Sequence, residues 1–294
     1  MKYIEKHPMI MIVIGVFGIS LSSIFVKYST APSAVTAAYR LLWTVVLMTP
    51  VTLGSTEIRT ELFHVNKRTV LLSCLSGLFL AVHFTLWFES LRHTSVASST
   101  TIVCTEVIWV SLGYALLLKG KISRKAVGAI AVTLIGSVLI ALADSSSDGA
   151  HLYGDVLSLL AAVAVAAYVL LGRIVREHSS TAVYTYIVYS ACSVSLLIIC
   201  IVQKMSLVGY GFSGILVGLL LAIFSTILGH SIFSWCLKYF SPSFVSASKL
   251  CEPVVAAVLA SFLFGEIPTG MQLSGGGLIL AGVFYYSVLE RKGE

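Results

Sequence analysis

The stretch His83-Phe-Thr-Leu-Trp87-Phe-Glu-Ser-Leu91 is echoed later in the chain by His230-Ser-Ile-Phe-Ser-Trp235-Cys-Leu237. The agreement continues further along, where Cys104-Thr-Glu-Val107 corresponds to Cys251-Glu-Pro-Val254. Both correspondences are offset by half the length of the 294-residue chain. A duplicated unit is the economical explanation of such an offset. We therefore predict that each half of the chain is one copy of the same structural repeat.

The composition places both repeats in a lipid bilayer. Hydrophobic residues make up 57% of the chain, charged residues make up 11%, and the mean hydropathy is +0.97. Soluble domains, in contrast, carry roughly a quarter charged residues. A helix needs about 20 apolar residues to cross about 30 Å of hydrocarbon. We predict an all-α integral membrane protein of ten such helices: Met9–Tyr28, Ala34–Leu53, Val70–Leu91, Val96–Leu118, Ala126–Ala143, Leu152–Gly172, Val183–Val202, Ile215–Leu237, Phe244–Phe264 and Met271–Leu289.

The positive charges predict the orientation of these helices. If the N-terminus is cytoplasmic, the cytoplasmic segments hold fourteen of the nineteen Lys and Arg residues. The opposite face then holds only Arg92 and Lys204, and Lys27, Arg40 and Lys249 lie within spans. Cytoplasmic loops of membrane proteins carry such an excess of Lys and Arg. We predict that both termini are cytoplasmic, and this distribution explains the net charge of +6 without a nucleic-acid partner.

Five helices per repeat is an odd number, so the second copy must cross the membrane in the opposite sense from the first. We therefore predict two inverted repeats, residues 1–147 and residues 148–294. Inverted repeats are typical of secondary transporters, in which a site between the halves opens to one side and then to the other. We expect alternating-access transport of a small molecule. A channel or facilitator is the alternative, because some channels share such a duplication.

Four stretches also resemble the EamA-type branch of the drug/metabolite transporter superfamily. They are Trp87-Phe-Glu-Ser-Leu91-Arg-His-Thr-Ser-Val-Ala-Ser-Ser, Arg40-Leu-Leu, Leu250-Cys-Glu-Pro-Val254 and Leu263-Phe-Gly-Glu266. The resemblance covers nearly the whole chain. It implies ten helices around a central cavity, lined mainly by helices one, three, four, six, eight and nine. It also implies export of amino acids or other small metabolites, or of drugs, without identifying the substrate.

The chain departs from this family at Glu106. The second repeat has Pro253 at the equivalent position, and the resemblance implies a Pro in the first repeat as well. Glu106 lies near the centre of its span, where a charged side chain costs at least about 2.5 kcal/mol and usually faces a cavity or a partner. We expect Glu106 either to carry protons or bind a cation in the cavity, or to be a protonated or ion-paired structural residue.

Other polar side chains within the spans are candidates for the same cavity. Glu252 lies nearly one turn from Lys249, so we predict that these two residues pair locally. The alternative is that both face the cavity, because their helix is equivalent to the one that holds Glu106. Lys27 and Arg40 lie nearer the outer boundary, where long side chains can extend to water. The resemblance places a structural basic residue at Arg40, and we predict structural roles for both.

Two histidine–tryptophan pairs occupy matching positions in the two repeats. His83 and Trp87 are four residues apart, whereas His230 and Trp235 are five apart. Such rings can stack on planar substrates or bind cations, and they also simply pack in helix bundles. We interpret all four as candidate cavity residues. Two charges at the outer end of the same helix as His83, Glu89 and Arg92, are three residues apart, so we predict that they pair.

An intramembrane hydrolase is the alternative from another functional class. Gly211-Phe-Ser-Gly214 has a form that resembles the short serine motif of rhomboid proteases. Ser213, however, lies at the outer edge of a span, whereas the histidines His83 and His230 lie much deeper. A nucleophile needs its base within hydrogen-bond reach. We therefore interpret Gly211–Gly214 as a turn and predict that the protein is not an enzyme.

No cofactor or metal is expected. The six cysteines have no metal-ligand spacing, and we predict that they pack as free thiols. They are Cys74, Cys104, Cys192, Cys200, Cys236 and Cys251. Without a nucleotide-binding motif, transport would be passive or coupled to an ion gradient, most simply of protons. We expect a multi-pass protein of the cytoplasmic membrane with a small-molecule substrate, and we leave the choice between monomer and homodimer open.

Overall fold

The computed structural model of the 294-residue chain describes residues 8–94, 96–144, 152–252, 254–255, 258–259, 262 and 269–292. Within these residues all regular secondary structure is helical. The helices are α2 (Pro8–Lys27), α3 (Ser33–Gly54), α4 (Thr56–His64), α5 (Lys67–His93), α6 (Val96–Cys104), α7 (Glu106–Leu117), α8 (Arg124–Asp144), α9 (Leu152–Arg176), α10 (Thr181–Val202), α11 (Gly211–Leu220), the π-helix η1 (Leu221–Ser231), α12 (Ile232–Cys236), α13 (Pro242–Lys249) and α15 (Gly270–Lys292). Pro253, residues 263–266 and the side chain of Lys27 lie outside what is described.

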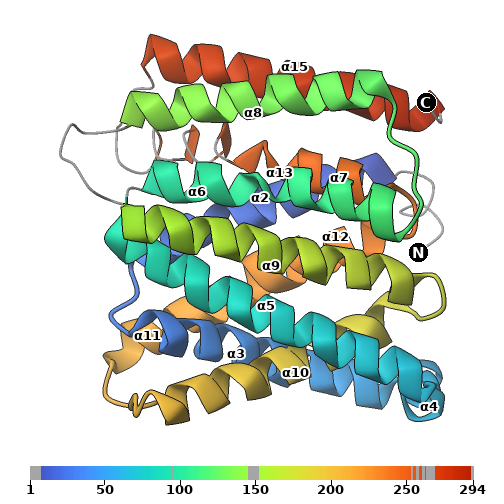
Figure 1. Cartoon of the computed structure of the whole chain (residues 1–294). Coiled ribbons are helices and arrows are strands. Elements are labelled where there is room, and N and C mark those ends of the chain that lie inside the picture. Colours follow the sequence, from blue (N-terminus) through green and yellow to red (C-terminus); the bar gives the residue numbers. More distant parts are fainter. Residues whose placement is uncertain are drawn as a thin grey trace.

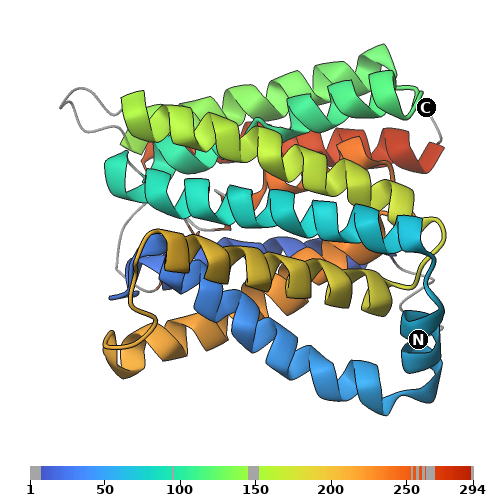
Figure 2. The ribbon, with the colours of Figure 1, turned by 60° about the horizontal axis from the view of Figure 1, so that its bottom comes forward.

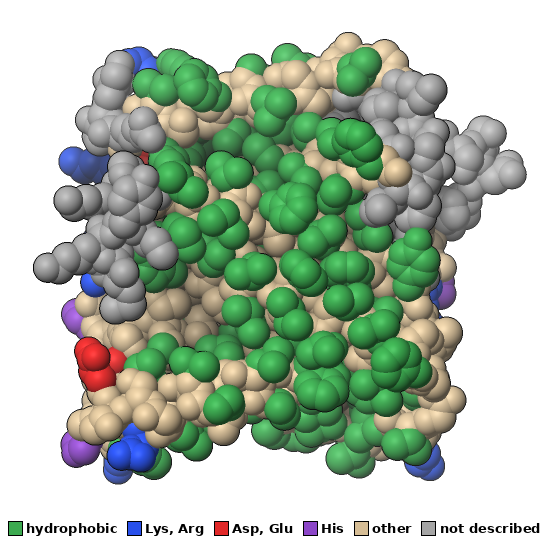
Figure 3. Space-filling view, turned by 180° about the vertical axis from the view of Figure 1, so that it is seen from behind, with side chains coloured by type: hydrophobic (Ala, Val, Ile, Leu, Met, Phe, Trp, Pro, Cys, Tyr) green, Lys and Arg blue, Asp and Glu red, His purple; other side chains and the backbone are tan. Residues whose placement is uncertain are grey.

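The described helices form a bundle with the surface chemistry of a membrane protein. Seven helical segments are long and apolar enough to cross a bilayer, and Ile102–Leu117 forms a shorter apolar segment. Figure 3 shows hydrophobic side chains spread over the middle of one face, with charged side chains gathered at its two ends. Such an apolar surface belongs in lipid, where no water can hydrogen-bond the backbone and helices satisfy its polar groups internally. The chain is therefore an all-helical membrane protein with at least seven candidate spans among the described residues.

The main contacts between helices of the two halves each have a counterpart between the equivalent helices. Along the first half the order is α2, α3, α5, α6 with α7, and α8; along the second it is α9, α10, α11 with η1 and α12, α13, and α15. The packing of α5 on α9 has its counterpart in that of α2 on η1. Likewise α10 packs on α5 as α11 packs on α3, while α8 lies against α15. The beginning of α2 and the end of α15 lie at the same end of the bundle (Figure 1).

Three predicted spans are not the uninterrupted α-helices that we expected. A turn at Thr105 separates α6 from α7, because the Thr105 hydroxyl and amide both donate to the Ile102 carbonyl, at 2.6 and 3.0 Å. A second turn follows α13 at Leu250 and Cys251. Both turns fall within the repeated Cys-containing motif. In the eighth span, α11 widens into η1, an 11-residue π-helix. π-Helices are rare, are mostly single-turn bulges within α-helices, and frequently lie at functional sites.

Glycine allows the close approach of α8 and α15. A Cβ atom at Gly136 would lie 2.6 Å from the Gly275 carbonyl oxygen, and one at Gly282 would collide with the Thr133 hydroxyl. Small residues let membrane helices approach closely in this way. Small residues recur eight positions apart in the two repeats, as Gly128 and Gly136 and as Ser274 and Gly282, and this spacing predicts such packing. The contacts confirm it for Gly136 and Gly282, whereas no described atom lies within 4 Å of a Cβ placed at Gly128.

A short helix, α4, crosses the end of α3 at the connection between the second and third spans (Figure 2). It begins after Ser55, whose hydroxyl accepts from the Ile58 amide. Glu61 of α4 accepts from the Ser180 amide at 2.7 Å and from the Ser179 hydroxyl at 3.1 Å. Because Ser179 and Ser180 immediately precede α10, this contact joins the two halves at one end of the bundle.

Candidate functional site

A buried chamber lies between the two halves of the chain. Its volume is about 50 Å³. Its walls come from α2, α3, α5, α6, α7, α9, η1, α13 and the residue Glu252, and they consist of Ile19, Ser22, Arg40, His83, Trp87, Val103, Glu106, Val165, His230, Lys249 and Glu252. The structure thus brings together six of the seven predicted cavity residues. It also adds one that we interpreted as structural, Arg40, from the second span.

An ion pair between the halves dominates one wall of the chamber. The Lys249 ammonium donates to the Glu106 carboxylate at 2.8 Å, and both side chains are buried. The turns that follow α6 and α13 explain why the two charges lie at helix ends. Glu106 is the first residue of α7 and Lys249 is the last residue of α13, so the anion meets a positive helix end and the cation a negative one. The predicted local pair of Lys249 with Glu252 is wrong, because the Lys249 ammonium reaches across to the other repeat.

Glu252 is the second carboxylate of the chamber. It lies on the wall beside Lys249 and is half-buried. No hydrogen bond or ion pair to it is recorded from another described residue. Its charged neighbours among the described residues are Lys249, Glu106 and Arg40, so Glu252 belongs to the same group of charges.

Arg40 is buried in the middle of the bundle, with 1% of its surface exposed. The expectation that it extends to the outer boundary is therefore wrong. Its Nε donates to the Thr226 hydroxyl of η1 at 2.7 Å and its Nη1 to Ser22 of α2 at 3.3 Å, while the guanidinium lies 4.2 Å from the ring centre of Phe84. The second terminal nitrogen, Nη2, has no hydrogen-bond partner in the part of the chain that the structure describes. The setting is created by η1, which packs against both α2 and α3 and so brings a segment that is far away in the sequence next to Arg40.

Aromatic rings line the remainder of the chamber. His83 makes a hydrogen bond to the Ala161 carbonyl at 3.0 Å and stacks on Trp87 with ring centres 5.9 Å apart. His230 packs edge-on against Phe84, with ring centres 5.4 Å apart. Trp235, in contrast, packs on Tyr239 with ring centres 4.4 Å apart and does not line the chamber.

Three polar atoms of the chamber residues are buried without a partner among the described residues. They are Arg40 Nη2, Trp87 Nε1 and His230 Nδ1. Buried polar groups are nearly always hydrogen-bonded, and each exception calls for water or a ligand. The chamber therefore offers unsatisfied hydrogen-bonding groups together with two cations and two carboxylates.

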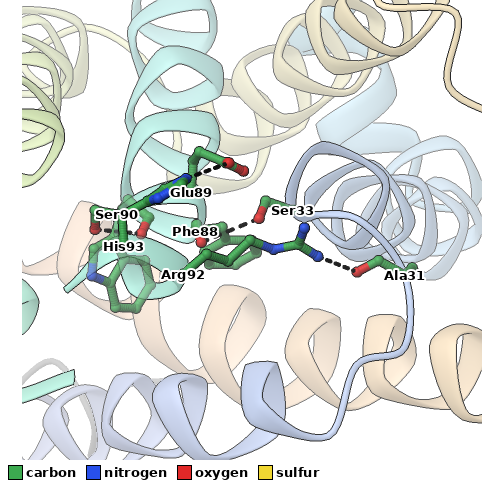
Figure 4. Close-up of polar contacts among 8 residues, drawn as sticks. Ala31, Ser33, Phe88, Glu89, Ser90, Arg92 and His93 are labelled. Atoms are coloured by element: carbon green, nitrogen blue, oxygen red, sulfur yellow. Dashed lines mark hydrogen bonds and ion pairs between the residues drawn. The ribbon is translucent and has the colours of Figure 1, made fainter. Parts of the chain in front are cut away.

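A second cavity, of about 240 Å³, lies where α2 ends, α3 begins and α5 ends. We call it the vestibule. It is lined by Ser23, Val26, Ser29, Ala31, Ser33, Thr36, Phe88, Leu91 and Arg92. Figure 4 shows Arg92 extending from α5 toward the carbonyl of Ala31, to which it donates at 3.3 Å. The predicted pairing of Arg92 with Glu89 is wrong, because Glu89 instead pairs with His93 at 3.2 Å.

The interpretation of Gly211–Gly214 as a turn is wrong, because these residues form the first turn of α11. The Ser213 hydroxyl is exposed and lies 3.2 Å from the Thr30 hydroxyl. Gly211 has a φ of +71° and is the first residue of α11. All six cysteines are free, as the sequence predicts.

Similar proteins agree with this architecture. A sequence model described as the EamA-like transporter family matches residues 7–142 and again residues 152–288. A "Probable amino-acid metabolite efflux pump" of Salmonella typhimurium is 29% identical over 76% of this chain and 79% of its own length. The "Uncharacterized transporter YxxF" of Bacillus subtilis is 25% identical over 98% of this chain and 90% of its own. A crystal structure with 17% identity superposes over 98% of this chain and 99% of that chain, with a TM-score of 0.78, and so shares the fold.

Proposed function

Because this chain belongs to the EamA-like transporter family, we propose that it exports small metabolites, amino acids or related compounds, by alternating access. The observation that carries the proposal is the chamber between the halves. Its two cations, Arg40 and Lys249, balance its two carboxylates, Glu106 and Glu252. Such a site suits a substrate that carries one charge of each sign. The name of the Salmonella typhimurium relative supports the same class.

The chamber must widen to hold such a substrate. Its volume of about 50 Å³ has room for only one or two water molecules, at about 30 Å³ of liquid volume each. Rocking of one repeat against the other would open it to either side in turn. We propose ten spans in two inverted repeats, residues 1–147 and 148–294, with both termini on the cytoplasmic side of the cell membrane. The exchangeable helix contacts and the shared location of the ends of α2 and α15 support this arrangement.

Proton coupling is assigned to Glu106 in this proposal. A proton on Glu106 removes the charge that holds Lys249, since the ion pair at 2.8 Å joins α7 of one repeat to α13 of the other. The freed ammonium can then turn to Glu252, one turn further along, or to a substrate carboxylate. No cofactor is needed for this cycle.

The test is transport by the purified protein in proteoliposomes. Labelled leucine is supplied outside, with and without unlabelled leucine inside. Acceleration of uptake by internal leucine, saturating with concentration, is the expected behaviour of a carrier. Flux that rises linearly without such counterflow would favour the channel alternative and refute alternating access.

A pH gradient across the same vesicles tests the coupling role. The Glu106→Gln variant is expected to retain counterflow and to lose its response to the gradient. Glu57→Gln, on the exposed face of α4, is the matched control and keeps the full response. If Glu106→Gln responds like the wild type, Glu106 does not couple transport to protons.

A further inference from the structure

We propose that the vestibule is a second binding site, separate from the chamber, that takes the carboxylate of a small molecule with an apolar side group. The inference rests on the proposed function, because it assigns the vestibule to the substrate's route. Its volume of about 240 Å³ equals that of about eight water molecules at about 30 Å³ each. Without any widening, the vestibule therefore accommodates a molecule of amino-acid size.

Arg92 supplies the cation of this site. Its side chain is exposed, and the one hydrogen bond recorded for it goes to a neutral backbone carbonyl, that of Ala31. The nearest acidic residue along the helix, Glu89, is held by His93 instead (Figure 4). A guanidinium has five N–H donors in a planar fork that matches a carboxylate. Most of these donors therefore have no recorded partner within the described ranges and can serve a ligand.

The first turn of α3 adds a second attraction for an anion. The helix begins at Ser33, and its N-cap residue, Pro32, makes no side-chain hydrogen bond to the free amides. The positive end of the helix dipole is thus uncapped beside Ser33 and Thr36, which line the vestibule. Independently, Ser23 lines the vestibule with 6% of its surface exposed, and its hydroxyl has no recorded partner in the described part of the chain.

The remaining walls define the rest of the ligand. The described lining residues of the vestibule include Arg92 and no acidic side chain, so their net charge is positive, unlike that of the balanced chamber. Val26, Phe88 and Leu91 provide an apolar surface beside Arg92. Such a site suits one carboxylate with an aliphatic group, and it needs no ammonium on the ligand.

The vestibule lies next to the chamber along two helices. On α2, Ser22 lines the chamber and Ser23 lines the vestibule; on α5, Trp87 lines the chamber and Phe88 the vestibule. In the proposed topology this end of the helices faces outward. The vestibule is then the station at which an exported molecule is held by its carboxylate before release.

Three probes that share an isobutyl group distinguish this site from the chamber. Leucine carries both charges, isovalerate carries the carboxylate alone, and isopentylamine carries the ammonium alone. Binding to full-length protein in phosphatidylcholine nanodiscs is measured by calorimetry. Isovalerate is expected to bind wild-type protein, isopentylamine is not, and Arg92→Gln is expected to weaken isovalerate binding at least tenfold. Arg92→Lys keeps the charge but loses the planar fork, so its affinity for isovalerate is expected to lie between those of the wild type and Arg92→Gln.

The control is Lys204→Gln, which removes the other predicted outer-face cation and leaves isovalerate affinity unchanged. Equal isovalerate affinity of wild type and Arg92→Gln overturns the proposal, while leucine counterflow would still support the proposed function. Loss of counterflow in a protein that binds isovalerate through Arg92 would instead refute the transporter mechanism alone. A third outcome also overturns the proposal. If the wild type retains phosphatidylglycerol but does not bind isovalerate, and Arg92→Gln does not retain the lipid, the vestibule is a site for a lipid phosphate.

Discussion

Removing Lys249 should destabilise the protein more than removing its partner does. In Lys249→Met, the Glu106 carboxylate loses its hydrogen bond at 2.8 Å and stays buried at the first residue of α7. Breaking a buried ion pair by deleting one partner costs about 3–5 kcal/mol, because an uncompensated charge remains. In Glu106→Gln the charge left behind is Lys249, which has Glu252 one turn away. We therefore expect a smaller loss, about 1–3 kcal/mol.

The double variant Lys249→Met with Glu106→Gln leaves no unpaired charge at this position. Its loss of stability should therefore be smaller than the sum of the losses in the two single variants, with a coupling energy of about 2–3 kcal/mol. The six free cysteines provide the assay, because four of them are buried and react with a thiol-specific fluorescent dye only on unfolding. For a chain of this size each kcal/mol shifts Tm by about 2–4 °C, so a loss of about 3–5 kcal/mol in Lys249→Met should lower Tm by about 6–20 °C.

Additive effects of the two substitutions would refute the reasoning. They would mean that Lys249 and Glu106 do not depend on each other for stability, and that the pair is not the element joining the two halves. An unchanged Tm for Lys249→Met would refute it as well. It would show that Glu106 is protonated, or that it finds another partner at little cost.

Further predictions concern packing, the buried arginine and topology. Gly282→Leu should cost about 1–3 kcal/mol by overpacking α15 against α8, whereas Gly128→Leu, in open space, should leave Tm unchanged in the same dye assay. Arg40→Lys should lower leucine counterflow at least tenfold although it preserves the charge, because a single ammonium cannot reproduce the two directed bonds to α2 and η1; counterflow equal to wild type would show that charge alone suffices. In a cysteine-free background, Arg59→Cys should react with membrane-impermeant maleimide only from the cytoplasmic side and Lys204→Cys only from outside, and the reverse labelling would invert the proposed topology.

The membrane class and most helix positions follow from the sequence, because the free energy of placing a helix in lipid is a sum over consecutive residues. Seven predicted spans coincide with described helices that are long and apolar enough to cross a bilayer. The family resemblance followed from short motifs, and the family match confirms it. The candidate cavity residues His83, His230 and Glu106 could be selected for a similar reason, since polar side chains in apolar runs are costly unless they face a cavity or a partner.

The partners of these residues depend on the lateral arrangement of helices, which spacing along one helix does not contain. Local spacing favoured Glu252 for Lys249 and Glu89 for Arg92, whereas the folded chain pairs Lys249 with Glu106 and leaves Arg92 at the vestibule. The break between α6 and α7 is a second feature that spacing does not predict. The turn at Thr105 makes Glu106 the first residue of α7, at the positive end of the helix dipole, which suits its negative charge. The sequence alone determined which side chains would be costly in lipid. Only the tertiary structure decided which opposite charge relieves that cost, because the attraction acts through space between helices that lie far apart in the chain.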